Sequence, residues 1–259
     1  MNDCINGNRF PASPMVNLVL LLLLLPSLLL AAHDDSVETV TNRGALWVGI
    51  DIPYGVMEFY DKAGKPAGID VDIAREIAGR LGTRVEFHSM PFAQLFKALK
   101  SGQVDLILSA VTITSERQKS MRFSSPYMDV GLFIAVSEKT TNINSSADLK
   151  GKRVGVLKGT TGEKYARDSK DIDSSMIRTF DSNPARLQAL ARGEVDAVIA
   201  HFVTTEIPGV KIIGKPLTQS YYGIVGRLPD KALMDEVEAV VRELKRNGKL
   251  AGIKRSYSD

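Results

Sequence analysis

ALKSGQVDLI, at residues 98–107, recurs as ALARGEVDAV at residues 189–198. Each copy has the pattern of a helix end, a capping glycine and a buried strand. Two such units, each within a run of alternating strands and helices, predict two similar α/β lobes rather than one sheet. Chance similarity is the alternative explanation, because helix–Gly–strand units are common.

The same alternation is visible toward the N-terminal side of the first copy. Residues 46–50 have the pattern of a buried strand, and apolar residues between 73 and 81 fall at helical spacing before Gly82. Asp70 and Asp72 invite a metal or acid–base interpretation. At i and i+2 near a helix start they point apart, so we interpret them as helix-capping residues.

Composition places the chain among ordinary globular proteins. Its 259 residues are enough for one large or two small domains, and its net charge of +3 comes from dispersed Lys and Arg residues. No basic run is dense enough to neutralise a row of phosphates, so nucleic acid is not an expected partner.

The N-terminus has the layout of a secretory signal peptide over residues 1–32. Arg9 precedes the Leu-rich stretch 16–30, and small residues lead to an expected cleavage near Ala32. A retained membrane anchor is the alternative, although Pro26 interrupts the stretch and its length is barely sufficient to span a bilayer. The single cysteine, Cys4, would leave with this segment. We therefore expect a mature periplasmic protein without a disulfide, a thiolate metal site or a lipid anchor.

Ligands of open α/β sheets collect at the carboxyl ends of the strands, and two facing lobes would place these ends on opposite walls of one cleft. The sequence segments expected at that cleft are residues 51–58, 90–92, 109–117, 159–163 and 200–204.

Arg117 is the central candidate on the first wall. Ser115 and Gln118 have the spacing of a capping box, which places Arg117 in the first turn of a helix. A cation opposes the helix dipole there unless an anion joins it. The alternative is a surface arginine that pairs with Glu116 or a neighbouring residue.

The second wall is predicted from VGVLKGTTGE at residues 154–163, a strand that runs into a Gly/Thr turn and a helix N-terminus. The stretch resembles a phosphate-binding loop loosely, but G-x-x-x-x-G-K-[ST] is not met because Glu163 precedes Lys164. A small carboxylate shared by both walls fits better than a nucleotide.

Taken in order, several stretches resemble the family 3 bacterial extracellular solute-binding proteins, the polar-amino-acid-binding components of ABC transporters. These are GID at 49–51 with Tyr54 and Glu58-Phe59, GIDVD at 68–72, TITSER at 112–117, FSSPY at 123–127, LKGKRVGV at 149–156 and GTTG at 159–162.

The resemblance implies a type II periplasmic-binding fold, with two α/β lobes joined by two crossover strands. We expect the crossings near residues 130–134 and 219–224, so that 41–130 plus 224–259 form lobe 1 and 131–223 form lobe 2.

The resemblance also implies a set of ligand-binding residues. Arg117 would bind the ligand's α-carboxylate in a bidentate pair, and Thr112 and Thr161 would add hydrogen bonds from opposite lobes. Tyr54 and Phe92 would form an aromatic wall, or serve as core residues, and Asp51 would contact a distal polar group. The remaining expected ligand contacts are Ser109, Ala110, Thr160 and His201.

His201 departs from the family pattern, which usually has an aspartate that binds the ligand's α-ammonium at this position. A neutral imidazole accepts one hydrogen bond from an ammonium and supplies no charge. A local shift of alignment is the alternative, because the segment up to Lys211 is short and contains Pro208.

The expected function is a periplasmic, monomeric binding protein that closes on a small amino acid or related carboxylate and delivers it to an ABC permease. No metal or cofactor is implied. The alternatives are an exported enzyme on the same scaffold, resembling cyclohexadienyl dehydratase or a lytic transglycosylase and using His201, Glu163 or Asp51 as acid–base groups, and a ligand sensor.

Overall fold

The computed structural model describes residues 34–201 and 209–257. The predicted signal peptide, its cleavage point and Cys4 lie outside the described residues, as do residues 202–208 with Pro208.

The described chain forms two α/β lobes, each built on a five-stranded sheet. Lobe 1 contains the sheet β4-β1-β5-β12-β6, in which β1 runs parallel to β4 and β5, and β12 runs antiparallel to β5 and β6. Its strands are β1 (Ala45–Ile50), β4 (Arg84–Ser89), β5 (Leu106–Ile107), β6 (Met121–Phe123) and β12 (Val225–Arg227), and a small hairpin joins β2 (Phe59–Tyr60) to β3 (Pro66–Ala67).

Helices cover both faces of the lobe 1 sheet. On one face Ile73 of α2 and Val237 of α7 pack with Leu106, and on the other Leu95 of α3 packs with Ile107. The two faces alternate along β5 because successive strand side chains point in opposite directions. The helices are α1 (Ser36–Arg43), α2 (Ile69–Arg80), α3 (Phe92–Lys100), α4 (Ser115–Gln118), α7 (Lys231–Arg246) and α8 (Lys249–Arg255).

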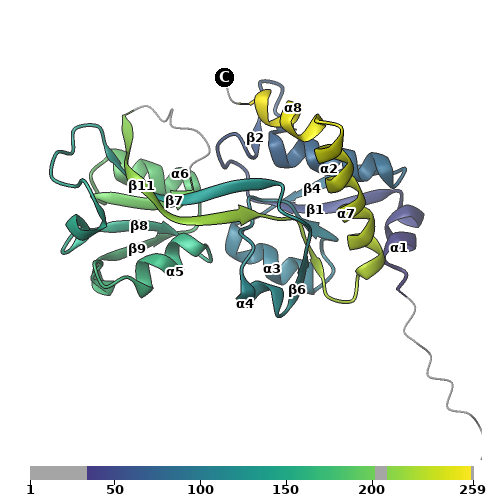
Figure 1. Ribbon diagram of the computed structural model, residues 1–259, viewed down its shortest axis with the longest axis horizontal. Coiled ribbons are helices and arrows are strands. Elements are labelled where there is room, and N and C mark those ends of the chain that lie inside the picture. Colours follow the sequence, from purple (N-terminus) through teal and green to yellow (C-terminus); the bar gives the residue numbers. More distant parts are fainter. Residues whose placement is uncertain (1–33, 202–208, 258–259) are drawn as a thin grey trace, which may run out of the picture. The chain divides into compact units, whose positions relative to one another are not determined.

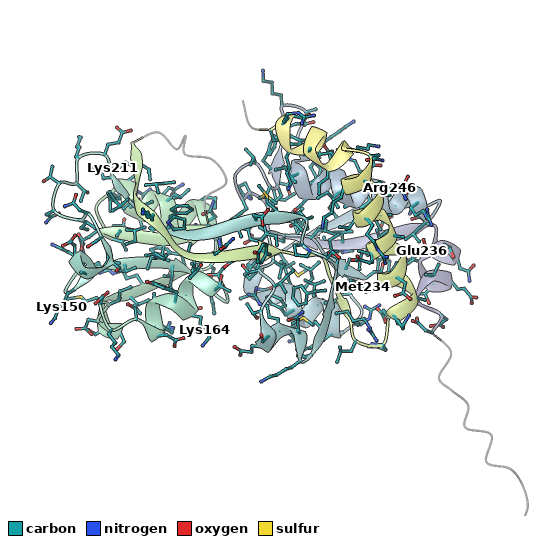
Figure 2. All side chains as sticks on the ribbon, viewed as in Figure 1. Lys150, Lys164, Lys211, Met234, Glu236 and Arg246 are labelled. Carbon is teal, nitrogen blue, oxygen red and sulfur yellow. The ribbon has the colours of Figure 1, made fainter. Side chains whose placement is uncertain are left out.

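Helix α7 shows how sequence pattern selects the buried face. Leu233, Met234, Val237 and Leu244 are buried at helical spacing. Figure 2 shows Glu236 and Arg246 of the same helix extending away from the sheet.

Lobe 2 contains the sheet β11-β7-β10-β8-β9. Helix α5 packs through Ala166 against Val156 on one face, and α6 packs through Leu190 against Val198 on the other. The elements are β7 (Met128–Ser137), β8 (Val154–Leu157), β9 (Ile177–Phe180), β10 (Ala197–His201), β11 (Val210–Tyr222), α5 (Thr161–Asp168) and α6 (Asn183–Ala191), with short 3₁₀ turns at Ser146–Leu149 and Ser174–Met176.

The long antiparallel pair of β7 and β11 connects the two lobes (Figure 1). Tyr222 pairs with Met128 at the end nearest lobe 1, and the register shifts between Ile213 and Thr218 further along. The chain then returns to lobe 1 as β12. The numbered boundaries 41–130, 131–223 and 224–259 stay predictions.

The internal repeat corresponds to equivalent units of the two lobes. In lobe 1, α3 is followed by Gly102 at φ 75° and then by β5, and in lobe 2, α6 is followed by Gly193 at φ 70° and then by β10. Glycine adopts this left-handed conformation without the steric cost that a Cβ adds. The prediction of two related α/β units is confirmed.

Two local predictions were wrong. Thr114, not Ser115, is the N-cap of α4, and its hydroxyl accepts a hydrogen bond from the Arg117 N–H. Asp70 does not cap α2, which begins after Gly68 without a side-chain cap; its carboxylate is buried and accepts a hydrogen bond from the Ala110 N–H at 2.7 Å. Asp72 is on the exposed side and pairs with Arg75.

Candidate functional site

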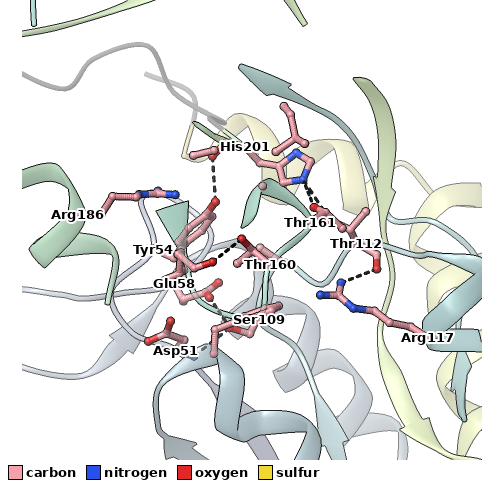
Figure 3. Close-up of a pocket in the computed structure, with 16 residues that line it drawn as sticks. Asp51, Tyr54, Glu58, Ser109, Thr112, Arg117, Thr160, Thr161, Arg186 and His201 are labelled. Atoms are coloured by element: carbon pink, nitrogen blue, oxygen red, sulfur yellow. Dashed lines mark hydrogen bonds between the residues drawn. The ribbon is translucent and has the colours of Figure 1, made fainter. Parts of the chain in front are cut away.

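A pocket lies where the two lobes face each other, and all ten residues expected from the sequence line it. Figure 3 shows the site from close range. Lobe 1 contributes Asp51, Tyr54, Phe92, Ser109, Ala110, Thr112 and Arg117, and lobe 2 contributes Thr160, Thr161 and His201; Glu58, Leu132, Leu157, Gly162, Arg186 and Ala200 also line the pocket.

The segment after β5 is held in an unusual backbone conformation. Ala110 has φ 48°, the only positive φ of a non-glycine residue in the described chain. Such a conformation costs about 1–2 kcal/mol and persists only where the surroundings impose it. The buried Asp70 carboxylate imposes it through the Ala110 N–H, and Ile113 N–H donates to Tyr221 O at the end of β11. Thr112 is thereby fixed at the pocket wall.

Arg117 spans the pocket from lobe 1 to lobe 2. Its Nη1 donates to Thr112 O at 2.8 Å, and its Nη2 donates across the cleft to Gly159 O at 3.0 Å. The guanidinium also lies 4.9 Å from the ring centroid of Phe96. Burial lowers the pKa of Arg117 to about 10, so the group stays charged at neutral pH.

Arg117 forms no ion pair within the described part of the chain. The expected alternative, a surface pair with Glu116, is therefore not formed. Instead a half-buried cation rests on two neutral carbonyl oxygens, an arrangement that an added carboxylate would stabilise.

The second wall is the turn between β8 and α5. Thr160 caps α5: its Oγ1 accepts the Glu163 N–H at 3.2 Å and donates to Leu157 O at 2.7 Å. Glu163 Oε2 accepts the Gly159 N–H and Oε1 pairs with Arg167. Glu163 is thus engaged in holding the turn and is not among the pocket-lining residues.

His201 closes one end of the pocket at the carboxyl end of β10. Its Nε2 lies 3.0 Å from Thr161 Oγ1 and 3.2 Å from Thr112 Oγ1, so the imidazole connects hydroxyls of both lobes. Burial lowers the pKa of His201 to about 4; the Gly131 backbone opposes this, and the nearby charges of Arg117 and Arg186 add to it. The imidazole is therefore neutral near pH 7.

Tyr54 provides a further cross-lobe contact. Its hydroxyl donates to His201 O at 3.0 Å, and its ring lines the pocket. Together with the contacts of Arg117 and Thr112, this bond holds the lobes closed on each other.

Asp51 and Arg186 lie at the end of the pocket opposite Arg117 (Figure 3). Burial raises the pKa of Asp51 to about 6. Arg186, on α6, is only 2% exposed and was missed in the sequence, where an arginine within a helical repeat has the pattern of a surface residue.

Glu58 was matched in the sequence but not selected as a site residue. It is fully buried beneath the pocket and accepts the Ser109 hydroxyl at 2.8 Å, while Glu58 Oε2 and Asp70 Oδ1 each lack a partner among the described residues. Burial, with the neighbouring Asp70, raises the pKa of Glu58 well above its ordinary value, and burial raises the pKa of Asp70 to about 6. Two carboxyl groups in contact share a proton under these conditions.

Two negative observations hold for residues 34–201 and 209–257. No group of three or more His, Cys, Asp or Glu side chains is arranged to bind a metal ion. Within the same ranges, no helix is both long and apolar enough to cross a membrane.

The family model of the bacterial extracellular solute-binding proteins, family 3, matches residues 46–259. This chain belongs to that family. Among relatives, the L-arginine-binding protein of Pseudomonas aeruginosa is 30% identical over 241 residues, covering 88% of this chain and 93% of the relative. The L-cystine-binding protein TcyJ of Escherichia coli is 27% identical over 233 residues, covering 87% of each.

Solved structures of the family share the fold. A mutant of ArgBP from T. maritima superposes with a TM-score of 0.81 at 34% identity, covering 86% of this chain and 98% of that one. The resemblance and the type II periplasmic-binding fold predicted from the sequence are confirmed. The family relatives are amino-acid-binding proteins, which supports a role for this chain in amino-acid transport.

Proposed function

We propose that this chain is the periplasmic amino-acid-binding component of an ABC importer. A small polar amino acid enters between the open lobes, its carboxylate pairs with Arg117, and lobe closure produces the form that the permease recognises. The two relatives named for L-arginine and L-cystine support an amino-acid ligand with a polar distal group.

The observation that carries this proposal is the position of Arg117. Its guanidinium contacts a carbonyl of each lobe and is half-buried, so it is only partly solvated by water. A carboxylate bound there would replace neutral acceptors by a bidentate charged one and connect both walls at once. Carboxylate binding and lobe closure are then one event.

Thr112 and Thr161 would complete the grip, because their hydroxyls face each other across the cleft at 3.4 Å. Tyr54 and Phe92 would enclose the side chain of the ligand, and Ser109 and Asp51 would lie beyond them. Thr160 would support the lobe 2 wall by capping α5, and Ala110 would support the lobe 1 wall through its left-handed backbone conformation.

The proposal is tested by calorimetry with a panel of amino acids and the variant Arg117→Ala. The variant should lose on the order of 3 to 5 kcal/mol of binding free energy, since the ligand carboxylate would be buried without its partner. This corresponds to a loss of more than about 100-fold in affinity. Arg192→Ala, at an exposed arginine of the same protein, serves as the control and should bind normally. A loss below tenfold in Arg117→Ala would remove Arg117 from this role.

Delivery to a permease is tested in cells. A strain without this protein should lose high-affinity uptake of the amino acid identified by calorimetry. The wild-type gene should restore uptake, and Arg117→Ala should not. Mass spectrometry of periplasmic protein should find a mature N-terminus near His33.

Catalysis is not part of this proposal. A neutral His201 with a pKa of about 4 is a weak base at pH 7, and Glu163 is engaged by Gly159 and Arg167 outside the pocket. Incubation with prephenate or arogenate should therefore give no turnover. Turnover that disappears in His201→Ala would require an enzymatic function instead.

A further inference from the structure

Arg186 is a buried cation that the carboxylate grip at Arg117 does not use. Its Nη1 donates to Ile199 O at 3.2 Å and its Nη2 to Asn183 Oδ1 at 2.5 Å, and both acceptors are neutral. Its Nε has no hydrogen-bond partner among the described residues, although the side chain lines the pocket. A buried guanidinium in this state favours an incoming anion, because Tyr54, Tyr222 and the unpaired Asp51 offset the desolvation of its charge only in part, and burial still lowers the pKa of Arg186.

Asp51 is the complementary group at the same end of the pocket. Its carboxylate receives the Phe92 N–H, while its Oδ2 has no partner among the described residues and the side chain is 8% exposed. Asp51 and Arg186 form no ion pair with each other, despite their opposite charges. Two buried pocket-lining groups, the Asp51 carboxyl group and the Arg186 guanidinium, therefore each retain one atom without a hydrogen-bond partner, Oδ2 and Nε.

We propose that Arg186 and Asp51 form a second head-group subsite, which takes the distal end of a ligand carrying an α-amino-acid group at each end. The distal carboxylate would accept from Arg186 Nε, and the distal ammonium would donate to Asp51 Oδ2. The first carboxylate would remain with Arg117, at the opposite end in Figure 3. This inference rests on the proposed function, because it assumes that Arg117 holds the first carboxylate.

Two simpler ligand types leave one of these groups unsatisfied. A distal cation alone, as in lysine, would pair with Asp51 but lie near the Arg186 charge and leave its Nε without an acceptor. A distal carboxylate alone would satisfy Arg186 and face Asp51 with a like charge. A purely structural role for Arg186, balancing the buried acids, predicts equal importance for every ligand.

The test compares three ligands of matched chain on the wild-type protein by calorimetry. LL-diaminopimelate has both head groups, L-lysine lacks only its distal carboxylate, and L-2-aminopimelate lacks only its distal ammonium. We expect diaminopimelate to bind at least tenfold more tightly than each of the other two. L-Cystine also carries an α-amino-acid group at each end, and we expect it to bind more tightly than lysine and 2-aminopimelate. Equal or tighter binding of lysine would overturn the proposal without any variant.

Two variants assign the contacts. Arg186→Gln should remove the advantage of diaminopimelate over lysine, and Asp51→Asn should remove its advantage over 2-aminopimelate. Circular dichroism and a cooperative thermal melt would establish that each variant is folded, and if Arg186→Gln does not fold, the ligand comparison on the wild type decides. A preserved advantage in a folded Arg186→Gln protein would exclude Arg186 from the subsite.

The outcomes separate this inference from the proposed function. If lysine binds best and binding depends on Arg117, the amino-acid-binding function holds and the two-headed ligand is rejected. If no amino acid binds, or if Arg117→Ala leaves binding unchanged, the proposed function itself fails.

Discussion

His201 closes one end of the pocket, and its surroundings keep it uncharged. The pKa of about 4 means that its charge does not change between pH 5 and 8. Its Nε2 faces the hydroxyls of Thr112 and Thr161, so only neutral acceptors surround the expected place of the ligand's first ammonium. Recognition at this end would thus depend more on the carboxylate than on the amino group.

The variant His201→Asp should change which part of the ligand is recognised. The new carboxylate would pair with the ammonium and should increase the preference for an amino acid over its 2-keto acid by about tenfold or more. Without ligand the variant should melt at a lower temperature, because it buries an unpaired charge. Thermal-shift titrations of the best-binding amino acid and its keto acid measure both effects. An unchanged preference would mean that the ammonium does not approach this position.

The sequence predicted Arg117 and Thr161, which lie in the first turns of α4 and α5, because the segments after β5 and β8 were expected at the carboxyl edges of the sheets, a general location for sites. It missed Arg186, on another helix. Arg186 lies three residues into α6, where its cationic side chain has the pattern of a solvated face. Nothing in the local sequence indicates that this helix turns Arg186 toward the pocket.

Two buried carboxyl groups, Glu58 and Asp70, lie where the segment before β2 meets the start of α2. Because the folded state raises both pKa values, it holds these protons more tightly than the unfolded chain does. The resulting contribution to stability is complete below the ordinary carboxyl pKa values near 4 and is lost as pH rises through about 6.

Glu58→Gln should therefore reduce the loss of stability between pH 5 and pH 8. Its amide can donate to Asp70 without a titrating proton, while the carbonyl still accepts from Ser109. We expect the melting temperature at pH 8 to rise by roughly 2–4 °C for each 1 kcal/mol recovered, with little change at pH 5. Asp168→Asn, at an exposed acid on α5, is the control. A pH profile parallel to the wild type would show that Glu58 does not hold the shared proton.

At the element scale, the internal repeat was sufficient to predict α3–β5 and α6–β10, because each unit combines helical spacing, a glycine and an apolar run. The start of α4 was predicted one residue too late. Thr114 and Ser115 are both suitable caps, and the choice depends on the extended backbone that pairing with β11 imposes on residues before Thr114. Asp70 was wrongly predicted to cap α2, because its actual hydrogen-bond partner, the Ala110 N–H, is distant in sequence.

At the scale of the whole molecule, the two lobes approach each other closely where α3 faces the turn after β8. Gly159 has φ 77°, and a Cβ at this position would lie 3.2 Å from the Cβ of Ala93. Side chains of any size at residue 159 therefore touch the opposite lobe in the closed form. This proximity makes closure measurable.

The double variant Ala93→Cys with Gly159→Cys should form a disulfide in the closed form alone. The required Cβ separation of about 3.8 Å is reached with a small outward movement, and the mature chain is expected to contain no competing thiol. Bound amino acid should accelerate cross-linking, as judged by non-reducing electrophoresis, and the oxidised protein should retain its ligand through dialysis. Each single variant is the control. A cross-linking rate independent of ligand would contradict ligand-driven closure.

The position of β12 has a consequence for biosynthesis. This strand follows lobe 2 in the chain, yet it lies between β5 and β6 inside the sheet of lobe 1. Ribosomal synthesis delivers it after every other strand of the described chain, so the lobe 1 sheet stays incomplete until then. A nascent chain therefore cannot complete its first lobe before its second is made, which would suit the proposed passage through a translocation channel in an unfolded state.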